Sequence, residues 1–165
     1  MKSWINPKIK IRSSPIGGKG MFACRNIKKD EIVIIWGGNF VTKKKLQKIN
    51  KKNKIIIQVD DNLYSIENRN QPDDDTYFMN HSCEPNVWMK DGVTFVAKKN
   101  IKKGEELKID YSMFESKNYV SKWNCNCRSK ICRKKITGKD YLIPELQKRY
   151  KNHFSPVINK RIQDK

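Results

Sequence analysis

The 165-residue sequence contains no long apolar run. No stretch of eighteen consecutive apolar residues occurs in it, so we expect no transmembrane helix. Its N-terminus, where Trp4, Pro7 and Lys8 lie close together, lacks the continuous apolar segment of a secretory signal peptide. A chain of this length suits one domain with a core of its own. The sequence therefore predicts a single soluble, intracellular domain.

Acidic residues are scarce in this chain. The chain contains seventeen acidic side chains and 36 Lys and Arg side chains, which gives a formal net charge of +19. Such a charge fits a nucleic acid, a lipid surface or an acidic protein as partner. Arg is scarce as well, because Lys outnumbers Arg 29 to 7, although phosphate-binding sites favour the bidentate fork of Arg. A general bias of composition, with Lys, Ile and Asn making up 65 residues, explains part of the charge equally well.

One acidic stretch interrupts this basic background. Between Gln58 and Met89 the only Lys or Arg is Arg69. The same stretch contains seven acidic residues, which are Asp60, Asp61, Glu67, Asp73, Asp74, Asp75 and Glu84. An acidic strip thus lies inside a basic protein.

The five cysteines do not suggest a disulfide framework, because their number is odd and nothing in the sequence indicates export. Three of them form the compact pattern Cys125-x-Cys127-x4-Cys132, which is typical of thiolate ligands for a metal. Cys24 follows the apolar residues Met21–Ala23, and we expect it to be a buried thiol without a ligand role.

A structural zinc ion needs a fourth ligand in a tetrahedral arrangement. The candidates are Cys24, Cys83, His81 and His153. We favour Cys83 because it lies in a turn beside Pro85 rather than among strand residues. The zinc would then tie the C-terminal loop to the turn at Asn80–His81 and form one wall of a pocket there. Three reduced thiols without a metal are the alternative.

The periodicity of the sequence predicts mainly strands. Alternating or apolar runs indicate strands at 8–12, 54–59 and 62–66, and Asp91–Gly92 indicates a hairpin between 87–90 and 93–97. The pattern Asn-Ile-Lys-Lys-(Asp or Gly)-Glu occurs at 26–31 and again at 100–105, each time before an apolar run. These repeats predict two similar strand entries in one β-rich domain.

Two helices are expected. A short helix at 42–50 would have Thr42 as its N-cap. A longer helix at 140–154 would carry Pro144 in its first turn and Leu142, Leu146 and Tyr150 along one side. Ser155–Pro156 then begins a final short segment.

Four motifs carry a resemblance to a known family. They are the glycine loop at 14–22, the segment Phe78–Asn86, the segment Gly104–Tyr111 and the cysteine pattern at 125–132. The glycine loop is a weak signal when taken alone. In this order the four motifs resemble those of SET-domain protein-lysine methyltransferases with a zinc-binding post-SET segment, and the chain is similar to small bacterial members of that family.

The resemblance implies a mostly β SET fold with short helices, in which the Asn80 turn and the Tyr111 segment cross in a knot-like arrangement. It implies a SET domain at 8–115, a post-SET zinc segment at 121–135 and a C-terminal helical extension at 136–165. It also implies one structural zinc ion per chain, held by Cys83, Cys125, Cys127 and Cys132.

The implied reaction is methyl transfer from S-adenosylmethionine to a lysine side chain of a basic protein, such as a histone or a histone-like protein. Alignment and a neutral amine matter most in such an in-line displacement, and burial in a narrow apolar channel lowers the pKa of a lysine. The resemblance makes Tyr111, at the end of this channel, the candidate catalytic residue. Asp110 and Glu106 are expected to brace the catalytic strand rather than to act as bases.

Family analogy also implies the residues around S-adenosylmethionine. Lys19, Gly20 and Met21 would contact it through their backbone, together with Asn80 and His81. Tyr64 is a weaker candidate for the same role. Three positions depart from the family pattern. Tyr77 stands where an arginine is frequent, Trp36 where a tyrosine often touches the substrate amine, and Ile109 where a Phe or Tyr helps to set the number of methyl groups.

The expected partners follow from charge. A basic peptide would dock along the acidic strip, and residues 117–165, with fourteen basic and three acidic side chains, would face nucleic acid bound to that substrate. No membrane partner is expected, and the implied location is the cytoplasm of a bacterium or the chromatin of a nucleus or host. The alternative is a catalytically weak module of the same fold that binds chromatin or nucleic acid, and cofactor binding discriminates between the two.

Overall fold

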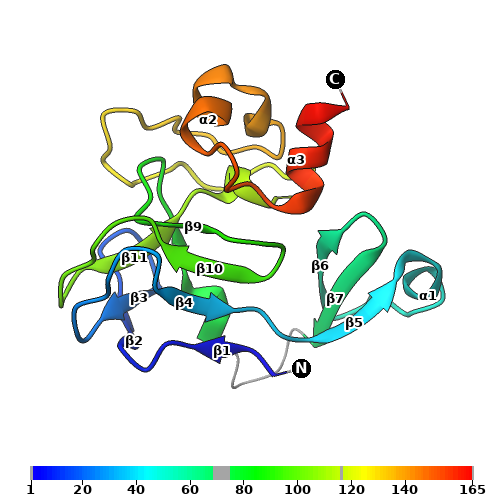
Figure 1. The fold of residues 1–165 in the computed structure, drawn as a ribbon, viewed down its shortest axis with the longest axis horizontal. Coiled ribbons are helices and arrows are strands. Elements are labelled where there is room, and N and C mark those ends of the chain that lie inside the picture. Colours follow the sequence, from blue (N-terminus) through cyan, green and yellow to red (C-terminus); the bar gives the residue numbers. More distant parts are fainter. Residues whose placement is uncertain (1, 69–74, 116, 165) are drawn as a thin grey trace.

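The computed structural model describes residues 2–68, 75–115 and 117–164, which form mainly short strands (Figure 1). The first sheet consists, in spatial order, of β1 (Trp4–Ile5), β4 (Ile32–Ile35), β10 (Thr94–Ala97) and β9 (Val87–Met89). The second consists of β2 (Ile9–Ser13), β3 (Lys19–Ala23), β11 (Glu106–Ile109) and β8 (Asn80–His81). The third consists of β5 (Asn39–Thr42), β7 (Leu63–Asn68) and β6 (Lys54–Asp60).

The helices in the described residues are few and short. They are α1 (Lys43–Gln47), α2 (Pro144–Arg149) and α3 (Pro156–Gln163), with 3-10 turns η1 (Asp75–Phe78), η2 (Tyr111–Met113) and η3 (Asp140–Leu142). In the part of the chain that is described, no helix has the length and apolar character needed to cross a membrane. The expected mostly β fold with short helices is therefore confirmed.

Two local predictions are confirmed in detail. Thr42 caps α1, because its hydroxyl accepts a hydrogen bond of 3.4 Å from the backbone N–H of Lys45. The hairpin around Asp91–Gly92 joins β9 and β10 as an antiparallel pair. Gly92 cannot be replaced there without a shift, since an added Cβ would lie 2.4 Å from the carbonyl oxygen of Val59.

The prediction of one helix over 140–154 was wrong in its extent. Instead, η3 is followed by the six-residue α2, which begins at Pro144. Ile143 has an extended backbone (ψ 119°), because the ring of the following proline disfavours helical geometry at the residue before it. Asn152, with φ 66°, then turns the chain toward α3.

The two repeated segments pair with each other. Ile27 and Ile101 form an isolated antiparallel bridge, and each backbone N–H donates to the other residue's carbonyl at 2.9 Å. The side-chain oxygens of Asn26 and Asn100 cross over, accepting from the backbone N–H groups of Lys103 (2.9 Å) and Lys29 (2.8 Å). The repeat is thus a local two-fold arrangement, which joins the segment before β4 to the segment before β11.

The C-terminal segment belongs to the main core. Tyr150, Phe154 and Ile158 are buried in the same apolar cluster as Met21 of β3 and Leu107 of β11. Figure 1 shows α2 and α3 lying over β9 and β10, while the third sheet and α1 project to one side. We infer that residues 136–164 fold together with the sheets.

Candidate functional site

A cavity of about 160 Å³ opens between the first two sheets and the turn η1. Its lining is mostly apolar and aromatic and consists of Ile34, Trp36, Thr76, Tyr77, Met79, Phe95, Ile109, Tyr111, Phe114 and Glu115. Glu115 is the one acidic residue in this set. The cavity thus suits an apolar chain with a polar or cationic end.

Aromatic rings build the walls of this cavity. The ring of Trp36 meets those of Phe95 and Phe114 edge to face, with centroids 4.3 and 5.2 Å apart. The ring of Tyr111 lies 5.6 Å from that of Phe114. The indole N–H of Trp36 is buried and has no hydrogen-bond partner among the described residues.

Hydrogen bonds hold both the side chain and the backbone of Tyr111 in place. Its hydroxyl donates to the carbonyl oxygen of Met79 (3.0 Å), and its backbone N–H donates to Nδ1 of His81 (3.2 Å). Burial raises the pKa of the Tyr111 hydroxyl well above its ordinary value. The hydroxyl therefore stays protonated at neutral pH.

The glycine loop, the Asn80 segment and strand β11, which leads to Tyr111, meet in the structure. The side-chain amide of Asn80 donates to the carbonyl oxygen of Lys19 (3.0 Å) and to Oε1 of Glu106 (2.8 Å). β8 runs parallel to β11 and β3 runs antiparallel to it, so β11 lies between the two motifs. An added Cβ at Gly20 would lie 2.3 Å from Oε1 of Glu106, so only glycine fits there without a shift.

This junction also fits a ligand bound through backbone groups. Gly17 and Gly18 have positive φ values of 147° and 56°, and an added Cβ at either would meet no atom within 4 Å. The loop backbone before β3 is therefore open to close approach. Tyr64 lies elsewhere, on the central strand of the third sheet, where it packs against the cluster of Val41, Leu46 and Ile66.

His81 uses both ring nitrogens inside the protein. Nδ1 accepts from Tyr111, so the proton resides on Nε2, which lies 3.4 Å from the sulfur of Cys83. Burial lowers the pKa of His81 to about 4. Although Nδ1 is 3.8 Å from a carboxylate oxygen of Asp110, a neutral ring makes no ion pair there. Any contact of His81 with a cofactor would therefore use its backbone or ring face.

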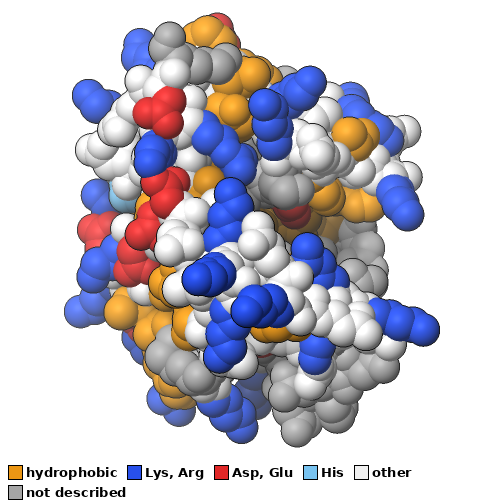
Figure 2. Space-filling model, turned by 90° about the vertical axis from the view of Figure 1, so that its right-hand side faces the viewer, with side chains coloured by type: hydrophobic (Ala, Val, Ile, Leu, Met, Phe, Trp, Pro, Cys, Tyr) orange, Lys and Arg blue, Asp and Glu red, His pale blue; other side chains and the backbone are white. Residues whose placement is uncertain are grey.

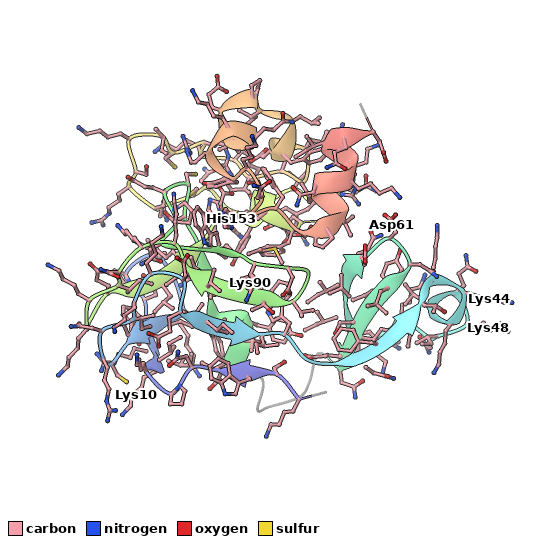
Figure 3. The ribbon with its side chains drawn as sticks, in the orientation of Figure 1. Lys10, Lys44, Lys48, Asp61, Lys90 and His153 are labelled. Atoms are coloured by element: carbon pink, nitrogen blue, oxygen red, sulfur yellow. The ribbon has the colours of Figure 1, made fainter. Side chains whose placement is uncertain are left out.

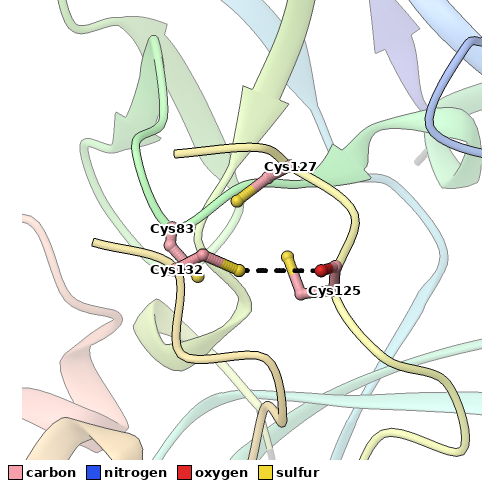
Figure 4. Close-up of side chains that lie close together, drawn as sticks. All are labelled: Cys83, Cys125, Cys127 and Cys132. Carbon is pink, nitrogen blue, oxygen red and sulfur yellow. Dashed lines mark hydrogen bonds between the residues drawn. The ribbon is translucent and has the colours of Figure 1, made fainter. Parts of the chain in front are cut away.

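Cys83, which His81 contacts, is one of four cysteines that lie close together (Figure 4). The sulfur atoms of Cys83, Cys125, Cys127 and Cys132 all lie within 4.8 Å of one another. Tetrahedral zinc with Zn–S bonds of about 2.3 Å requires sulfur separations of about 3.8 Å, so a small contraction would complete the site. The set is the one favoured from the sequence, while His153 instead stacks on Trp88 at 3.4 Å.

The chemistry of the thiols also fits a divalent cation. Burial raises the pKa of Cys83 above its ordinary value and raises that of Cys125 to about 12. At Cys127 burial acts in the same direction, but hydrogen bonds from the backbone of Ser129 and Cys83 prevail and lower the pKa to about 7. Cys127 thus loses its proton easily, whereas Cys83 and Cys125 require a nearby positive charge to do so.

Cys24 is separate from this cluster. It is half-buried, with its sulfur 3.7 Å from the carbonyl oxygen of Pro7. The expectation of a buried thiol was wrong, because β3 ends at Ala23 and the chain then enters the exposed turn at Arg25–Asn26.

Arg133 is a central residue that the sequence did not reveal. Its guanidinium bonds both carboxylate oxygens of Asp110 at 2.7 Å, and its Nε bonds Asp140 at 2.8 Å. Its backbone N–H donates to the sulfur of Cys83 at 3.3 Å. Tyr150 adds a hydrogen bond of 3.0 Å to Asp110. The cysteine segment, the residue before Tyr111 and the C-terminal segment are therefore joined at one ion-pair network.

The acidic strip is only partly described. Asp73 and Asp74 lie outside the described residues, so their predicted part in docking is an open proposal. Of the others, Asp61 pairs with Lys160 of α3, and Glu84 accepts a hydrogen bond of 3.1 Å from Ser129. Glu67 accepts one of 2.5 Å from the hydroxyl of Tyr77, which lines the cavity.

Comparison with known proteins places these features in a family. Residues 18–112, more than half of the chain, match the SET domain. Histone-lysine N-methyltransferase 2B of Homo sapiens is 30% identical over 147 residues, and the match covers 81% of this chain and 5% of that protein. Histone-lysine N-methyltransferase trithorax of Drosophila virilis is 29% identical over 148 residues, covering 81% of this chain and 4% of that protein.

A shorter match comes from histone-lysine N-methyltransferase ash1 of Drosophila melanogaster, which is 38% identical over 79 residues, or 44% of this chain and 4% of that protein. The chain thus spans about one twentieth of the length of these curated relatives. The domain match, which covers more than half of the chain, shows that the chain belongs to the SET-domain family.

Proposed function

We propose that this protein is a protein-lysine methyltransferase that uses S-adenosylmethionine. The observation that carries the proposal is the apolar cavity lined by Tyr111, Trp36 and Phe114. Its shape and lining suit the four methylene groups of a lysine side chain. The relatives named as histone-lysine N-methyltransferases support the same reaction.

The cavity residues would prepare the amine. Apolar walls disfavour an ammonium ion, so burial lowers the pKa of the entering lysine and increases the fraction of neutral amine. The hydroxyl of Tyr111 and the carbonyl oxygen of Met79, 3.0 Å apart, form a polar pair in a mostly apolar wall. We assign to this pair the orientation of the amine, with Tyr111 as the catalytic residue.

The methyl donor would lie on the far side of Tyr111, at the junction of the glycine loop and the Asn80 turn. The backbone of Lys19, Gly20 and Met21, with Asn80 and His81, would hold it there. When bound, S-adenosylmethionine supplies the methyl group as an electrophile. Asn80 keeps the loop and the strand β11 together through its bonds to Lys19 and Glu106.

We further propose that Cys83, Cys125, Cys127 and Cys132 hold one structural zinc ion. The four-thiol set and its separations fit this metal. With zinc bound, Cys83 would fix the turn after His81 and Cys132 would fix Arg133. The metal would thereby stabilise one wall of the site without taking part in the methyl transfer.

The proposed substrate is a lysine within a basic protein segment, with histones or histone-like proteins as the first candidates. Glu115 lines the cavity, and Glu67 contacts the cavity residue Tyr77. Two carboxylates near the site, on a protein of net charge +19, favour a cationic peptide at this point. The names of the relatives agree with such a substrate.

Two measurements test the proposal. Calorimetry should detect binding of S-adenosylmethionine, whereas a binding module without activity need not bind it. The protein should then transfer label from the methyl group of S-adenosylmethionine to lysines of purified histones or of a cell extract, mapped by mass spectrometry. Binding without label on any lysine would contradict a methyltransferase that acts on lysine.

A further inference from the structure

A dense group of lysines covers the outer end of the third sheet. It comprises Lys43, Lys44, Lys45, Lys48, Lys51 and Lys52, all exposed, and we call it the α1 lysine cluster. No acidic residue occurs between positions 43 and 59. Lys44 and Lys48 project outward from α1, away from the two larger sheets (Figure 3).

The overall composition does not account for this density. Lysine makes up 29 of 165 residues, so a window of ten residues would contain fewer than two on average, whereas residues 43–52 contain six. Figure 2, which faces this side of the molecule, shows Lys and Arg side chains across much of the surface, with most of the visible acidic side chains on the left.

The cluster is also unfavourable for the helix that carries it. Lys43 begins α1, where the helix dipole favours acidic residues, and the first turn contains no acidic residue. Lys44 and Lys45 also belong to the last turn of this short helix, where the dipole favours them. Lys44 and Lys48 are four residues apart and repel each other. Among the described residues, no member of the cluster forms an ion pair, and the nearby Asp61 pairs with Lys160 instead.

The lysines of the cluster repel one another, and no acidic side chain in the described part of the chain offsets this repulsion. Such an uncompensated group of charges indicates a partner outside the protein. We propose that the α1 lysine cluster binds the phosphate backbone of duplex DNA without reading its sequence. The cluster contains no arginine, so it lacks the bidentate fork that reads guanine. Residues 43–54 contain no aromatic side chain, so there is no platform on which unpaired bases could stack.

Duplex DNA suits the cluster better than an acidic protein does. DNA carries one charge per about 1.7 Å of its axis, and lysines that contact it release condensed counterions. The six positive charges within ten residues of sequence are complementary in sign to this dense negative charge. None of the cluster residues lines the cavity of Tyr111, so DNA bound at α1 would leave the cavity free. The inference is thus independent of the proposed methyltransferase activity.

The test compares two charge-matched variants of the full chain. In the first, Lys43, Lys44, Lys45 and Lys48 are all replaced by Gln. In the control, the exposed Lys28, Lys29, Lys102 and Lys103 of the two paired turns are replaced by Gln, since there only the backbone N–H groups make contacts. Fluorescence anisotropy measures the Kd of two unrelated 20-base-pair duplexes over a series of NaCl concentrations.

The wild-type protein should bind both duplexes alike, with log Kd rising steeply with log salt. Each lysine that contacts a phosphate contributes about 0.9 to this slope, so the cluster variant should lose about 2 to 4 units and the control less than one. A third variant with Arg at the four cluster positions should retain the slope. Because Gln relieves the repulsion in α1, the thermal midpoint of the cluster variant should equal or exceed that of the wild type, which excludes unfolding as the cause.

Three outcomes would overturn the inference. One is the absence of DNA binding at low salt. Another is an equal loss of slope in the cluster and control variants, which would show a general effect of net charge. The third is tighter binding to poly-glutamate than to DNA at equal charge concentration, which would make an acidic protein the partner.

Discussion

Arg133 bonds both carboxylate oxygens of Asp110 at 2.7 Å, and Asp110 directly precedes Tyr111 in the chain. Asp110 is fully buried. Its Oδ1 also accepts a hydrogen bond from the backbone N–H of Ser112, so Asp110 is the N-cap of η2. Arg133 follows Cys132, so the ion pair links the cysteine cluster to the turn that carries Tyr111. The position of the proposed catalytic hydroxyl therefore depends on the C-terminal third of the chain.

Replacing Arg133 by Gln should destabilise the protein by about 3–5 kcal/mol, because the buried carboxylate of Asp110 loses its charged partner. The double variant Arg133→Gln with Asp110→Asn should recover much of this loss, since no buried charge is left unpaired. Urea unfolding followed by circular dichroism measures both. Equal stability of the single variant and the wild type would show that the pair is not needed for folding.

The same pair predicts a loss of stability in acid. Burial favours the neutral carboxyl of Asp110, but the hydrogen bonds and charge of Arg133 prevail and hold its pKa below the ordinary value of 3.8. The unfolded chain then binds a proton at a higher pH than the folded chain does. The stabilisation is complete above the unfolded pKa and disappears as the pH falls through the lower folded value.

Thermal unfolding between pH 6 and pH 2 measures this effect. We expect the wild-type midpoint to fall more steeply below pH 4 than that of the double variant Arg133→Gln with Asp110→Asn. Parallel curves for the two proteins would assign the acid sensitivity to other carboxylates.

Tyr111→Phe should reduce kcat by at least about a hundredfold and leave the Kd of S-adenosylmethionine nearly unchanged. In the wild type, the hydroxyl contributes more to aligning the amine in the transition state than to binding in the ground state. Single-turnover kinetics and calorimetry measure the two quantities. A variant with turnover near that of the wild type would remove Tyr111 from the mechanism.

One zinc ion per chain is expected from elemental analysis of the purified protein. Cys83→Ser should lose most of the metal, because zinc then keeps three thiolates only, whereas Cys24→Ser should retain it as a matched control. Chelation should reduce activity more than it lowers the thermal midpoint, since the main apolar core contains none of the four cysteines, which lie in a separate cluster. Full zinc content in Cys83→Ser would contradict the proposed ligand set.

Glu115→Gln should raise the KM for a basic peptide several-fold at low salt and have a smaller effect at high salt. Its carboxylate lines the cavity and attracts the positive charge of the peptide, and added ions screen this attraction. Glu145→Gln, at an exposed position of α2 outside the cavity lining, removes the same charge and serves as the control. If both variants changed the KM equally, Glu115 would have no special role in docking.

The sequence alone determined the class of the fold and the motifs of the site. Period-two apolar patterns, the Asp-Gly turn and the Thr42 cap are local signals, because they act between residues close in the chain, and the structure contains each of them. The cysteine spacing likewise indicated three of the four clustered thiols. The choice of Cys83 as the fourth also agreed with the structure, because a turn leaves its thiol free to face a distant loop.

Only the tertiary structure decided how these parts act together. Nothing near Arg133 in the chain indicates that it would pair with Asp110, 23 residues away, since such pairing depends on which surfaces fold over each other. The same holds for the pairing of Ile27 with Ile101 and for the burial of Tyr150. Local propensity fixes the geometry of neighbours, whereas contacts between distant residues form only where the packed core brings them within bonding distance.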